Sequence, residues 1–529
     1  MLDIVLENGR VIDGVRDRAY VADLGIVADK IVKIGNCAGA EAATRLDCGG
    51  LIVAPGFIDM HSHSDELLLI NATADSKIRQ GITTEVGGNC GSSPAPLSDD
   101  MFARKAQELR ERYDYEISWR GFDGFFAALE RAPAALNFCC LAGLGTVRSA
   151  VGGSQPRPLE PDRLALAQRL TREACEQGAI GVSSGLIYQP GSFADSDELS
   201  ALARAAAEAN SPLYASHIRS EGDALLEAVD EAIDVGRRAD CAVQLSHHKA
   251  AGPANWGKVH DSLARVDRAI RSGHDVVLDQ YPYKASSTGL DVILPEDVNV
   301  GSPEDIASRL ADKRYAALVA LRVDLKYGGR WHSVVVSSVG SAKNRHFEGL
   351  TMVDVGKAMG RRPVDAALQL LVEERLDVSA IYFTMCEEDV QTVLSYGRTC
   401  VGSDASARVL AGPTARGKPH PRAFGTFPRI FKRYVRDIRV LSLEEAVRRT
   451  SALPAQRLGL RGRGVIAESN FADVVVFDSE RIADNATYEE PQRFPSGIEH
   501  VLVNGIGVVR NGEITGSRPG RVLRRGRDL

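Results

Sequence analysis

The chain has 529 residues, several times the length of a usual single domain, so it has room for several domains or for one large barrel with attached segments. Hydrophobic residues make up 44% and charged residues 25%, which excludes a disordered, collagen-like or coiled-coil chain. The 64 Lys and Arg against 70 Asp and Glu give a net charge of -6, so no overall basic field exists to bind nucleic acid or an anionic membrane surface. Only the tail, residues 518–527, is basic.

The cysteines and the N-terminus indicate the compartment. Nine cysteines, an odd number without regular spacing, favour free thiols in a reducing environment over a disulfide framework. Asp3 and Glu7 occupy positions where a signal peptide needs a basic start followed by an apolar run. No stretch of about 18 apolar residues occurs. We therefore expect a cytoplasmic protein that does not span a membrane.

The two ends of the chain predict short β-strands separated by turns such as Asn8-Gly9 and Asn511-Gly512. Both sets of strands need a partner face, so we expect residues 1–56 and 455–529 to form one small β domain together. The expected strands are 4–6, 11–12, 21–26, 30–34, 472–477, 500–503 and 505–510.

Between the two ends, residues 57–454 alternate apolar, β-branched runs with helical stretches rich in Ala, Leu, Glu and Arg, the pattern of a parallel (β/α)8 barrel. Charged, mixed sequence interrupts this alternation from about 293 to about 349, which predicts an insertion that acts as a lid over the strand ends. The sequence offers nine candidate strands, one more than an eight-stranded barrel needs, and we take 381–385 as the surplus strand. The candidate strands are 52–60, 82–86, 136–142, 179–183, 212–216, 242–246, 275–280, 381–385 and 399–403.

The strongest local signal is GFIDMHSHSD, in which His61 and His63 follow an apolar run. Residues two apart in a strand point to the same side, so both imidazoles can reach one ion. His217 in YASHIRSEGD and His247 in QLSHHKAAG end two further candidate strands. The C-terminal ends of barrel strands converge on one mouth, where barrel enzymes place their chemistry. The four histidines therefore predict a metal site at that mouth, while His248 should point to the opposite side of its strand.

Two more ligand-type side chains follow candidate strands. Cys90, in VGGNCGSSPAP, lies among loop-forming residues, and Asp404, in CVGSDAS, ends another strand. Imidazole and thiolate with one carboxylate favour zinc over magnesium or calcium. Because the six residues are spread from position 61 to position 404, and structural zinc sites are usually local clusters, we expect a catalytic site. A nucleophilic role for Cys90 ranks behind both metal hypotheses.

Cationic, acidic and phenolic side chains gather in the same loops. Cations and phenols beside a metal suit a substrate that carries a carboxylate, held by charge-assisted hydrogen bonds. The candidates are Tyr188, Arg219, Glu221, Lys249, Tyr281, Tyr283 and Arg422.

The chain resembles the N-acyl-D-amino-acid deacylases (D-aminoacylases) of the amidohydrolase superfamily in a long series of motifs, which runs in order from about residue 1 to about residue 478. The resemblance implies a distorted TIM (β/α)8 barrel, a small β-sandwich domain formed by both termini, and a segment inserted after the YPY motif. The motifs are GFIDMHSHSD, GNCGSSPAP, GLIYQPG, ASHIRSEGD, SHHKAAGPANWGK, DQYPYKASSTGL, VGSDAS, HPRAFGTFPR and TSALPAQRLGL.

The resemblance also implies a metal shell. Members of this family hold a tightly bound zinc ion with a Cys and two His, and many superfamily members use a carboxylated lysine to bridge two metals. No lysine stands at the fourth strand end, SSGL, so whether one or two zinc ions are needed stays open. The tight position would use Cys90, His217 and His247, and a second, weaker position would use His61, His63 and Asp404.

The same resemblance implies the reaction. Asp404 would act as general base and then general acid in the hydrolysis of N-acyl-D-amino acids, which releases a carboxylic acid and a free D-amino acid. One departure is Leu144 in AGLGTVRSAVGG, where relatives usually have a histidine, and it leaves the fine substrate assignment open. The residues that would bind the substrate carboxylate are Tyr188, Lys249, Arg422 and, with less support, Tyr281.

Two alternatives stand beside this interpretation. A cyclic amidase of the dihydropyrimidinase or hydantoinase type would share the barrel, but it normally uses the bridging lysine that is missing here. A non-catalytic scaffold on the same fold is a further alternative, and the presence of all six ligand-type residues argues against it. The preferred D-amino acid, the acyl group and the oligomeric state are left open by the sequence.

Overall fold

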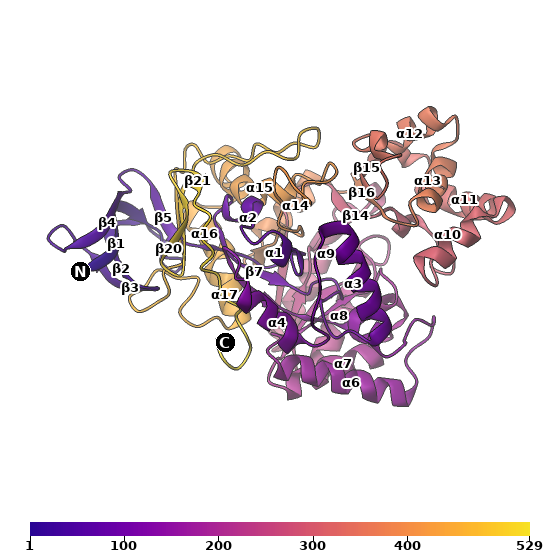
Figure 1. Cartoon of the computed structure of the whole chain (residues 1–529), viewed down its shortest axis with the longest axis horizontal. Helices are drawn as coiled ribbons and strands as arrows, with labels where there is room; N and C mark the ends of the chain where they lie inside the picture. Colours follow the sequence, from indigo (N-terminus) through magenta and orange to yellow (C-terminus); the bar gives the residue numbers. More distant parts are fainter.

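Eight parallel strand positions form the central barrel of the computed structural model, which describes residues 1–529 (Figure 1). Six strands pair in the order β17-β13-β12-β11-β10-β9 and three in the order β6-β7-β8, and β8 and β9 share one position because only Leu141 separates them. The backbone N–H of Asp404 donates to the carbonyl O of His61 at 2.7 Å, which closes the barrel between β17 and β6. The strands are β6 (Phe57–Asp59), β7 (Ile82–Gly87), β8 (Asn137–Cys140), β9 (Ala142–Gly143), β10 (Val182–Gly185), β11 (Leu213–His217), β12 (Ala242–Leu245), β13 (Val276–Gln280) and β17 (Thr399–Val401).

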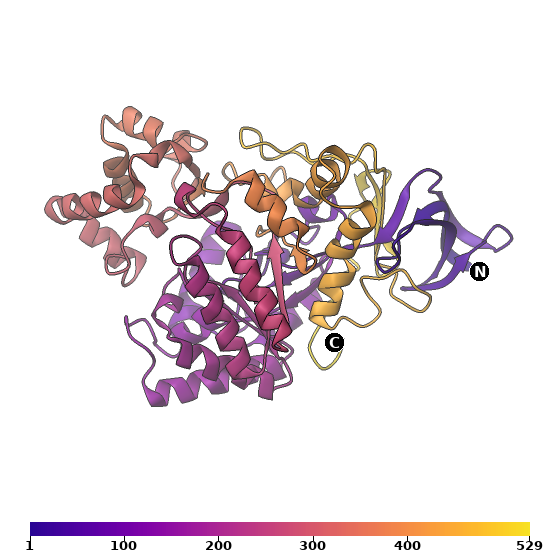
Figure 2. The same ribbon diagram turned by 180° about the vertical axis from the view of Figure 1, so that it is seen from behind.

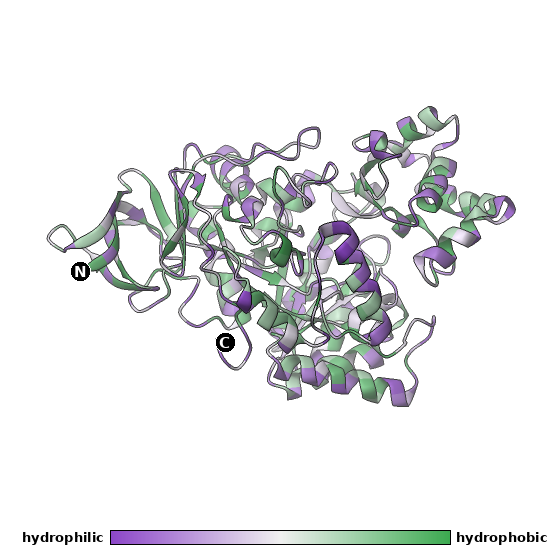
Figure 3. Cartoon of the chain, in the orientation of Figure 1, coloured by the Kyte–Doolittle hydropathy of each residue, from purple (hydrophilic) through white to green (hydrophobic).

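Amphipathic helices cover the outside of the barrel. In α8, buried residues from Leu225 to Ala239 recur three or four positions apart and face the strands, while the opposite side is charged. Helices α6 to α9 pack consecutively along one flank, as the two opposite views in Figure 1 and Figure 2 show. Figure 3 shows alternating hydrophobic and hydrophilic residues along these helices. The barrel helices are α3 (Asp99–Tyr113), α4 (Phe122–Arg131), α5 (Leu144–Ala150), α6 (Pro161–Glu176), α7 (Ser196–Glu208), α8 (Leu225–Ala239), α9 (Lys258–Arg271), α14 (Glu387–Ser395), α15 (Arg422–Arg429), α16 (Leu443–Thr450) and α17 (Ala452–Leu458).

Strands from both ends of the chain form one sheet beside the barrel, with the order β21-β20-β19-β18-β5-β1-β2-β3 and β4 paired with β1. The junction is the antiparallel pair of β5 and β18, in which Val53 faces Val476. Leu6, Val53 and Val476 belong to one hydrophobic cluster of 13 buried residues. The strands are β1 (Leu2–Val11), β2 (Tyr20–Val27), β3 (Lys30–Gly35), β4 (Ala42–Asp47), β5 (Ile52–Pro55), β18 (Val474–Phe477), β19 (Ile498–Val503), β20 (Ile506–Arg510) and β21 (Glu513–Ile514).

A separate unit follows β13 and projects from the mouth side of the barrel (Figure 1). Its strand β16 pairs antiparallel with β14 and β15, so the predicted strand 381–385, which overlaps β16 at residues 381–382, is correctly left out of the barrel. The unit has a hydrophobic core of 24 buried residues from Leu290 to Tyr382, so it extends beyond 293–349 on both sides. Its elements are β14 (Ser286–Gly289), α10 (Pro303–Ala311), α11 (Lys313–Tyr327), β15 (Val334–Val339), α12 (Met352–Met359), α13 (Pro363–Glu373) and β16 (Val378–Tyr382).

The C-terminal tail enters the base of the barrel. The backbone N–H of Leu523 donates to the carbonyl O of Phe138 at 2.8 Å, and Leu523 and Leu529 join a hydrophobic cluster with residues from six barrel strands. Arg524 pairs with Asp123 at 2.7 Å and with Glu130 at 2.9 Å. The basic charge of the tail is therefore partly neutralised by barrel helix α4.

None of the helices combines the length and the apolar character that a membrane-spanning segment needs.

Leu523→Ala is expected to lower the free energy of unfolding by about 2–5 kcal/mol, because it opens a cavity at a site where Leu523 is only 2% exposed. Thermal unfolding followed by circular dichroism measures this loss. Leu318→Ala is the matched control, since Leu318 is 65% exposed on α11, and it should change stability by less than about 0.5 kcal/mol. Equal effects of the two substitutions would show that the tail does not contribute to the barrel core.

Candidate active site

The sequence-predicted metal ligands lie together at one mouth of the barrel. His61 and His63 follow β6, Cys90 follows β7, and His217 is the last residue of β11. His247 follows β12, and Asp404 follows β17. The parallel register places all of these strand ends on the same side of the barrel. His248 points the other way, as predicted, and its Nε2 lies 2.7 Å from the hydroxyl of Ser262 on α9.

The thiol of Cys90 is the centre of the cluster. Its Sγ lies 3.3 Å from His61 Nε2, 3.4 Å from His247 Nε2 and 3.6 Å from His217 Nδ1. Burial disfavours the thiolate, but the neighbouring His61 and His247 outweigh it and hold the pKa of Cys90 well below its usual range. A thiolate surrounded by imidazole nitrogens is a typical donor set for zinc.

Asp404 closes the other side of the cluster. Its Oδ1 lies 3.0 Å from His63 Nε2 and 3.6 Å from His61 Nε2. Ligand atoms of His61, Cys90, His247 and Asp404 all lie within 4.8 Å of one another, a separation that one or two metal ions can bridge. Burial disfavours the charge on Asp404, but Arg422 and His247 hold the pKa of the carboxyl well below its usual range.

Three of these residues adopt a left-handed backbone conformation. The φ angle is +53° at Cys90, +34° at His247 and +50° at Asp404. Such angles are uncommon outside glycine and cost free energy, so the surrounding structure must hold them in place. The turns aim the thiol, imidazole and carboxylate into the mouth instead of letting the chain continue as a strand.

Two carboxylates orient the histidines of the site: Glu221, which the sequence had placed in the loops at the mouth, and Asp279, which it had not. Asp279, at the end of β13, accepts from His61 Nδ1 at 3.2 Å and from the backbone N–H of His247 at 2.8 Å. This contact leaves His61 Nε2 facing Cys90. Glu221 Oε1 lies 3.0 Å from His247 Nδ1 and 3.9 Å from His217 Nε2. The position of Asp279 in DQYPY, at the end of a predicted strand, was the available signal.

The predicted carboxylate-binding residues surround the same centre. Lys249 forms an ion pair with Glu221, and its Nζ lies 2.8 Å from His247 Nδ1. Arg422 Nη1 lies 2.8 Å from Asp404 Oδ2, and its guanidinium carbon lies 4.6 Å from the ring centroid of Tyr281. All of these side chains are buried or half-buried.

Two neighbouring cavities reach the centre. One, of about 510 Å³, is lined by Cys90, Tyr188, Asp404 and Arg422, and a second, of about 820 Å³, is lined by Lys249 and Tyr281 among others. The hydroxyl of Tyr188 lies 3.1 Å from that of Thr288, on β14 of the inserted unit. The inserted unit therefore contributes to the walls of the site.

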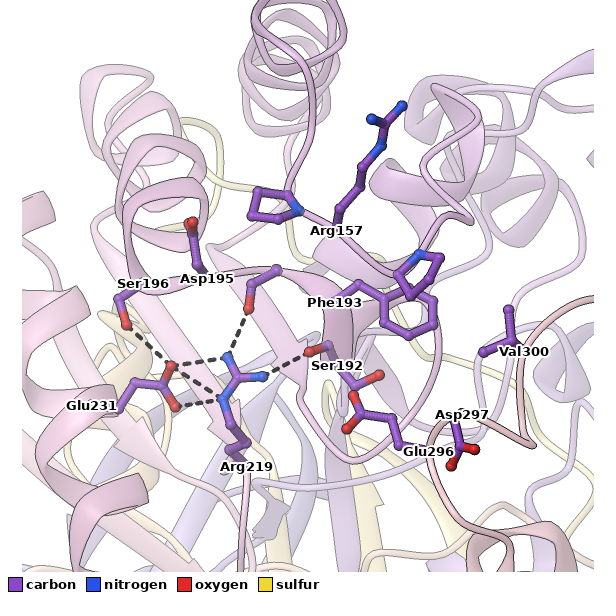
Figure 4. A pocket seen from close by; sticks show the side chains of 13 residues that line it. Arg157, Ser192, Phe193, Asp195, Ser196, Arg219, Glu231, Glu296, Asp297 and Val300 are labelled. Atoms are coloured by element: carbon purple, nitrogen blue, oxygen red, sulfur yellow. Dashed lines mark hydrogen bonds and ion pairs between the residues drawn. The ribbon is translucent and has the colours of Figure 1, made fainter.

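Two other residues that the sequence singled out, Arg219 and Leu144, lie outside the metal-ligand cluster. The Arg219 guanidinium pairs with Glu231 at 2.9 Å and donates to the carbonyl oxygens of Ser192 and Ala194, both at 2.8 Å. Arg219 lines a separate pocket of about 860 Å³, shown in Figure 4, which contains none of the six predicted ligands. Leu144, the departure from the family pattern, is 3% exposed in the main hydrophobic core and does not line the cavity beside Cys90.

The chain matches a protein family and full-length relatives of known activity. Residues 45–297 and 347–509 match the model of the Amidohydrolase family, and the gap between them falls in the inserted unit. An N-acyl-D-glutamate deacylase from Alcaligenes xylosoxydans xylosoxydans is 40% identical over 527 residues, which cover 99% of this chain and 97% of that protein.

Solved structures agree with this match. A D-aminoacylase crystal structure has a TM-score of 0.84 at 34% identity, covering 99% of this chain and 100% of that one. An N-acyl-D-glutamate deacylase from Bordetella bronchiseptica, complexed with zinc and a phosphonate that mimics the tetrahedral intermediate, has a TM-score of 0.82 at 36% identity, covering 99% of both chains. A D-hydantoinase structure, with a TM-score of 0.56 at 16% identity over 99% of both chains, shares the fold alone.

Proposed function

Because the chain belongs to the amidohydrolase family, we propose that it is a zinc-dependent hydrolase that cleaves the amide bond of N-acyl-D-amino acids and releases a carboxylic acid and the free D-amino acid. The observation that carries the proposal is the convergence of His61, Cys90, His247 and Asp404 within 4.8 Å at the barrel mouth, beside buried cations. Full-length similarity to deacylases that act on N-acyl-D-amino acids supports the substrate class.

The donor set fits zinc because a thiolate-forming sulfur faces three imidazole nitrogens at 3.3–3.6 Å, and nitrogen and sulfur donors are those that zinc prefers. When bound, zinc supplies a Lewis acid that polarises the acyl carbonyl and lowers the pKa of water. We assign the tightly bound ion to Cys90, His217 and His247, and a weaker position to His61, His63 and Asp404.

Asp404 carries the proton. Its low pKa keeps the carboxylate ionised at neutral pH, so it can orient the attacking water and accept a proton at a carboxylate oxygen. The same group then returns that proton to the amide nitrogen, which leaves as the amine. His63 Nε2, at 3.0 Å, fixes Asp404 Oδ1 during the exchange.

Buried cations hold the substrate. Lys249, Arg422, Tyr281 and Tyr188 line the cavities at the centre and offer charge-assisted and phenolic hydrogen bonds to an α-carboxylate. Arg422 lies 2.8 Å from Asp404, so a carboxylate held by Arg422 places the scissile amide within reach of the proton carrier. Fixing the α-carboxylate and the amide together leaves only one enantiomer with its side chain in open space.

The alternatives have less support. The likeness to hydantoinases extends to the fold alone, and the strand end of β10, Ser183, Ser184 and Gly185, offers no lysine to bridge two metals. All six ligand-type residues converge, which argues against a scaffold without chemistry. We also propose a cytoplasmic location, since none of the nine cysteines forms a disulfide.

Removal of zinc is expected to abolish activity. Dialysis against a chelator should lower the release of amino acid from N-acetyl-D-amino acids by about 100-fold or more, and added zinc should restore it. Cys90→Ala should bind less zinc, measured by atomic emission, whereas Cys386→Ala, a half-buried thiol outside the site, should keep the wild-type content. Full activity in a preparation that contains no metal would contradict the proposed function.

A further inference from the structure

A third cavity, of about 280 Å³, extends from the active site between the sheet of the inserted unit and the loop after β17. His63, Asp404 and Arg422 border its inner end. Six of its other lining residues carry hydroxyls, and they are joined by Arg408, His420 and four small or apolar residues. The hydroxyl-bearing residues are Ser287, Thr288, Ser337, Ser338, Ser379 and Ser406, and the small or apolar ones are Gly289, Ala405, Pro419 and Ala423.

Arg408 has no counter-ion. Its Nη1 donates to the carbonyl O of Arg416 at 2.9 Å, and no carboxylate pairs with the guanidinium. Arg422, in contrast, is paired with Asp404 at 2.8 Å. Burial lowers the pKa of Arg408, which means that the charge is held in a poorly hydrated place without compensation. An anion that enters this cavity would remove that cost.

The serines supply the matching donors. The hydroxyl of Ser337 donates to the carbonyl O of Lys418 at 2.9 Å, while the hydroxyls of Ser338, Ser379 and Ser406 have no partner within the chain. Unpartnered hydroxyls that line the same cavity as an unpaired arginine can donate to a carboxylate bound there. The volume also suits a short acidic group with a few water molecules, since each water occupies about 30 Å³.

Resting on the proposed function, we propose that this cavity binds a second carboxylate of the substrate through Arg408, so that the preferred N-acyl-D-amino acid is a dicarboxylate. Arg422, Lys249 and Tyr281 serve the α-carboxylate at the centre, and Arg408 serves the remote one. The remote carboxylate belongs to an acidic amino-acid side chain or to a dicarboxylic acyl group, and both carry the same chemistry to Arg408.

Four substrates separate these sources: N-acetyl-D-glutamate, N-acetyl-D-glutamine, N-succinyl-D-leucine and N-acetyl-D-leucine. Arg408→Met should lower kcat/KM for the preferred dicarboxylate about 10- to 100-fold. The kcat/KM values for N-acetyl-D-leucine and N-acetyl-D-glutamine should change less than about 3-fold. If kcat/KM falls only for N-acetyl-D-glutamate, the remote carboxylate belongs to the amino-acid side chain. If it falls only for N-succinyl-D-leucine, the remote carboxylate belongs to the acyl group.

Arg416→Met is the matched control, because Arg416 is exposed, does not line the cavity, and contacts Arg408 only through its backbone carbonyl. It removes the same charge from the same loop and should leave all four rates close to wild type. Ser338→Ala is a second variant that keeps the charge, and it should reduce the dicarboxylate rate selectively by about 3- to 10-fold. This variant retains the test if Arg408→Met does not fold.

If Arg408→Met and Ser338→Ala lower kcat/KM equally for dicarboxylate and neutral substrates, the proposal is overturned. So would a wild-type protein that cleaves N-acetyl-D-leucine faster than either dicarboxylate. A wild-type protein that cleaves none of the four substrates would refute the proposed function itself, which distinguishes that failure from failure of the Arg408 site.

Discussion

Asp404→Asn is expected to lower kcat by about 10²–10⁴-fold, because an amide can neither accept the proton of the attacking water nor return it to the leaving amine. The substitution preserves shape. Asn also tolerates the left-handed conformation that Asp404 adopts at φ +50°, so the turn after β17 should survive. Cys90, His217 and His247 are unchanged, and the tightly bound zinc should therefore remain.

Single-turnover kinetics and metal analysis on the same preparation test this expectation. Asp114→Asn is the matched control, since Asp114 is exposed and has a similar φ of +53°, and it should leave activity unchanged. Near wild-type turnover by Asp404→Asn would refute the role of Asp404. Loss of activity together with loss of zinc would assign Asp404 to metal retention instead of proton transfer.

Lys77→Met is expected to lower the free energy of unfolding by about 3–5 kcal/mol, the range for breaking a buried ion pair and leaving the partner unpaired. Lys77 is fully buried, and its Nζ lies 2.8 Å from Asp59 and 2.6 Å from Glu85. It also donates to the hydroxyl of Ser403 at 2.9 Å and to the carbonyl O of Ala405 at 2.8 Å. These contacts join β6, β7 and the residues on either side of Asp404.

Thermal unfolding measures the effect, and Lys343→Met is the control. The Lys343–Glu373 pair spans 2.9 Å, but the Lys343 side chain is 72% exposed, so its loss should cost less than about 1 kcal/mol. A comparable loss in both variants would show that the buried network does not stabilise the closure of the barrel. Replacing Lys77 together with Asp59 and Glu85 by neutral residues should recover part of the stability.

Much of the site was predictable because barrel geometry converts sequence position into spatial position. Residues at successive strand ends, such as His61, His217 and His247, must meet at one mouth, and the structure brings them together around Cys90. The predicted surplus strand, 381–385, overlaps β16 (Val378–Tyr382), which pairs outside the barrel, although the spacing of the strands alone did not single it out. The convergence of the histidines follows from local pattern and chain order alone.

Other features depend on tertiary contacts that a single sequence does not display. Asp279 and Lys77 resemble ordinary polar residues of a strand end and a short helix, and only the fold shows that they orient His61 and clamp β6 to β7. The inserted unit was expected to be shorter, because helices α12 and α13 have the same amphipathic pattern as barrel helices. The sequence showed the tail only as a basic end of the β domain, yet Leu523 anchors it inside the barrel.

The chirality of the released amino acid decides whether the protein is a hydrolase of N-acyl-D-amino acids. Racemic N-acetyl-DL-glutamate and N-acetyl-DL-leucine are each incubated with the zinc-loaded protein, and the free amino acid is resolved by chiral chromatography. We expect release of the D-enantiomer, with the L-substrate left intact. Release of the L-enantiomer, or of both at equal rates, would contradict the assignment to N-acyl-D-amino acids, and no release from either racemate would contradict the amide-hydrolysis reaction itself.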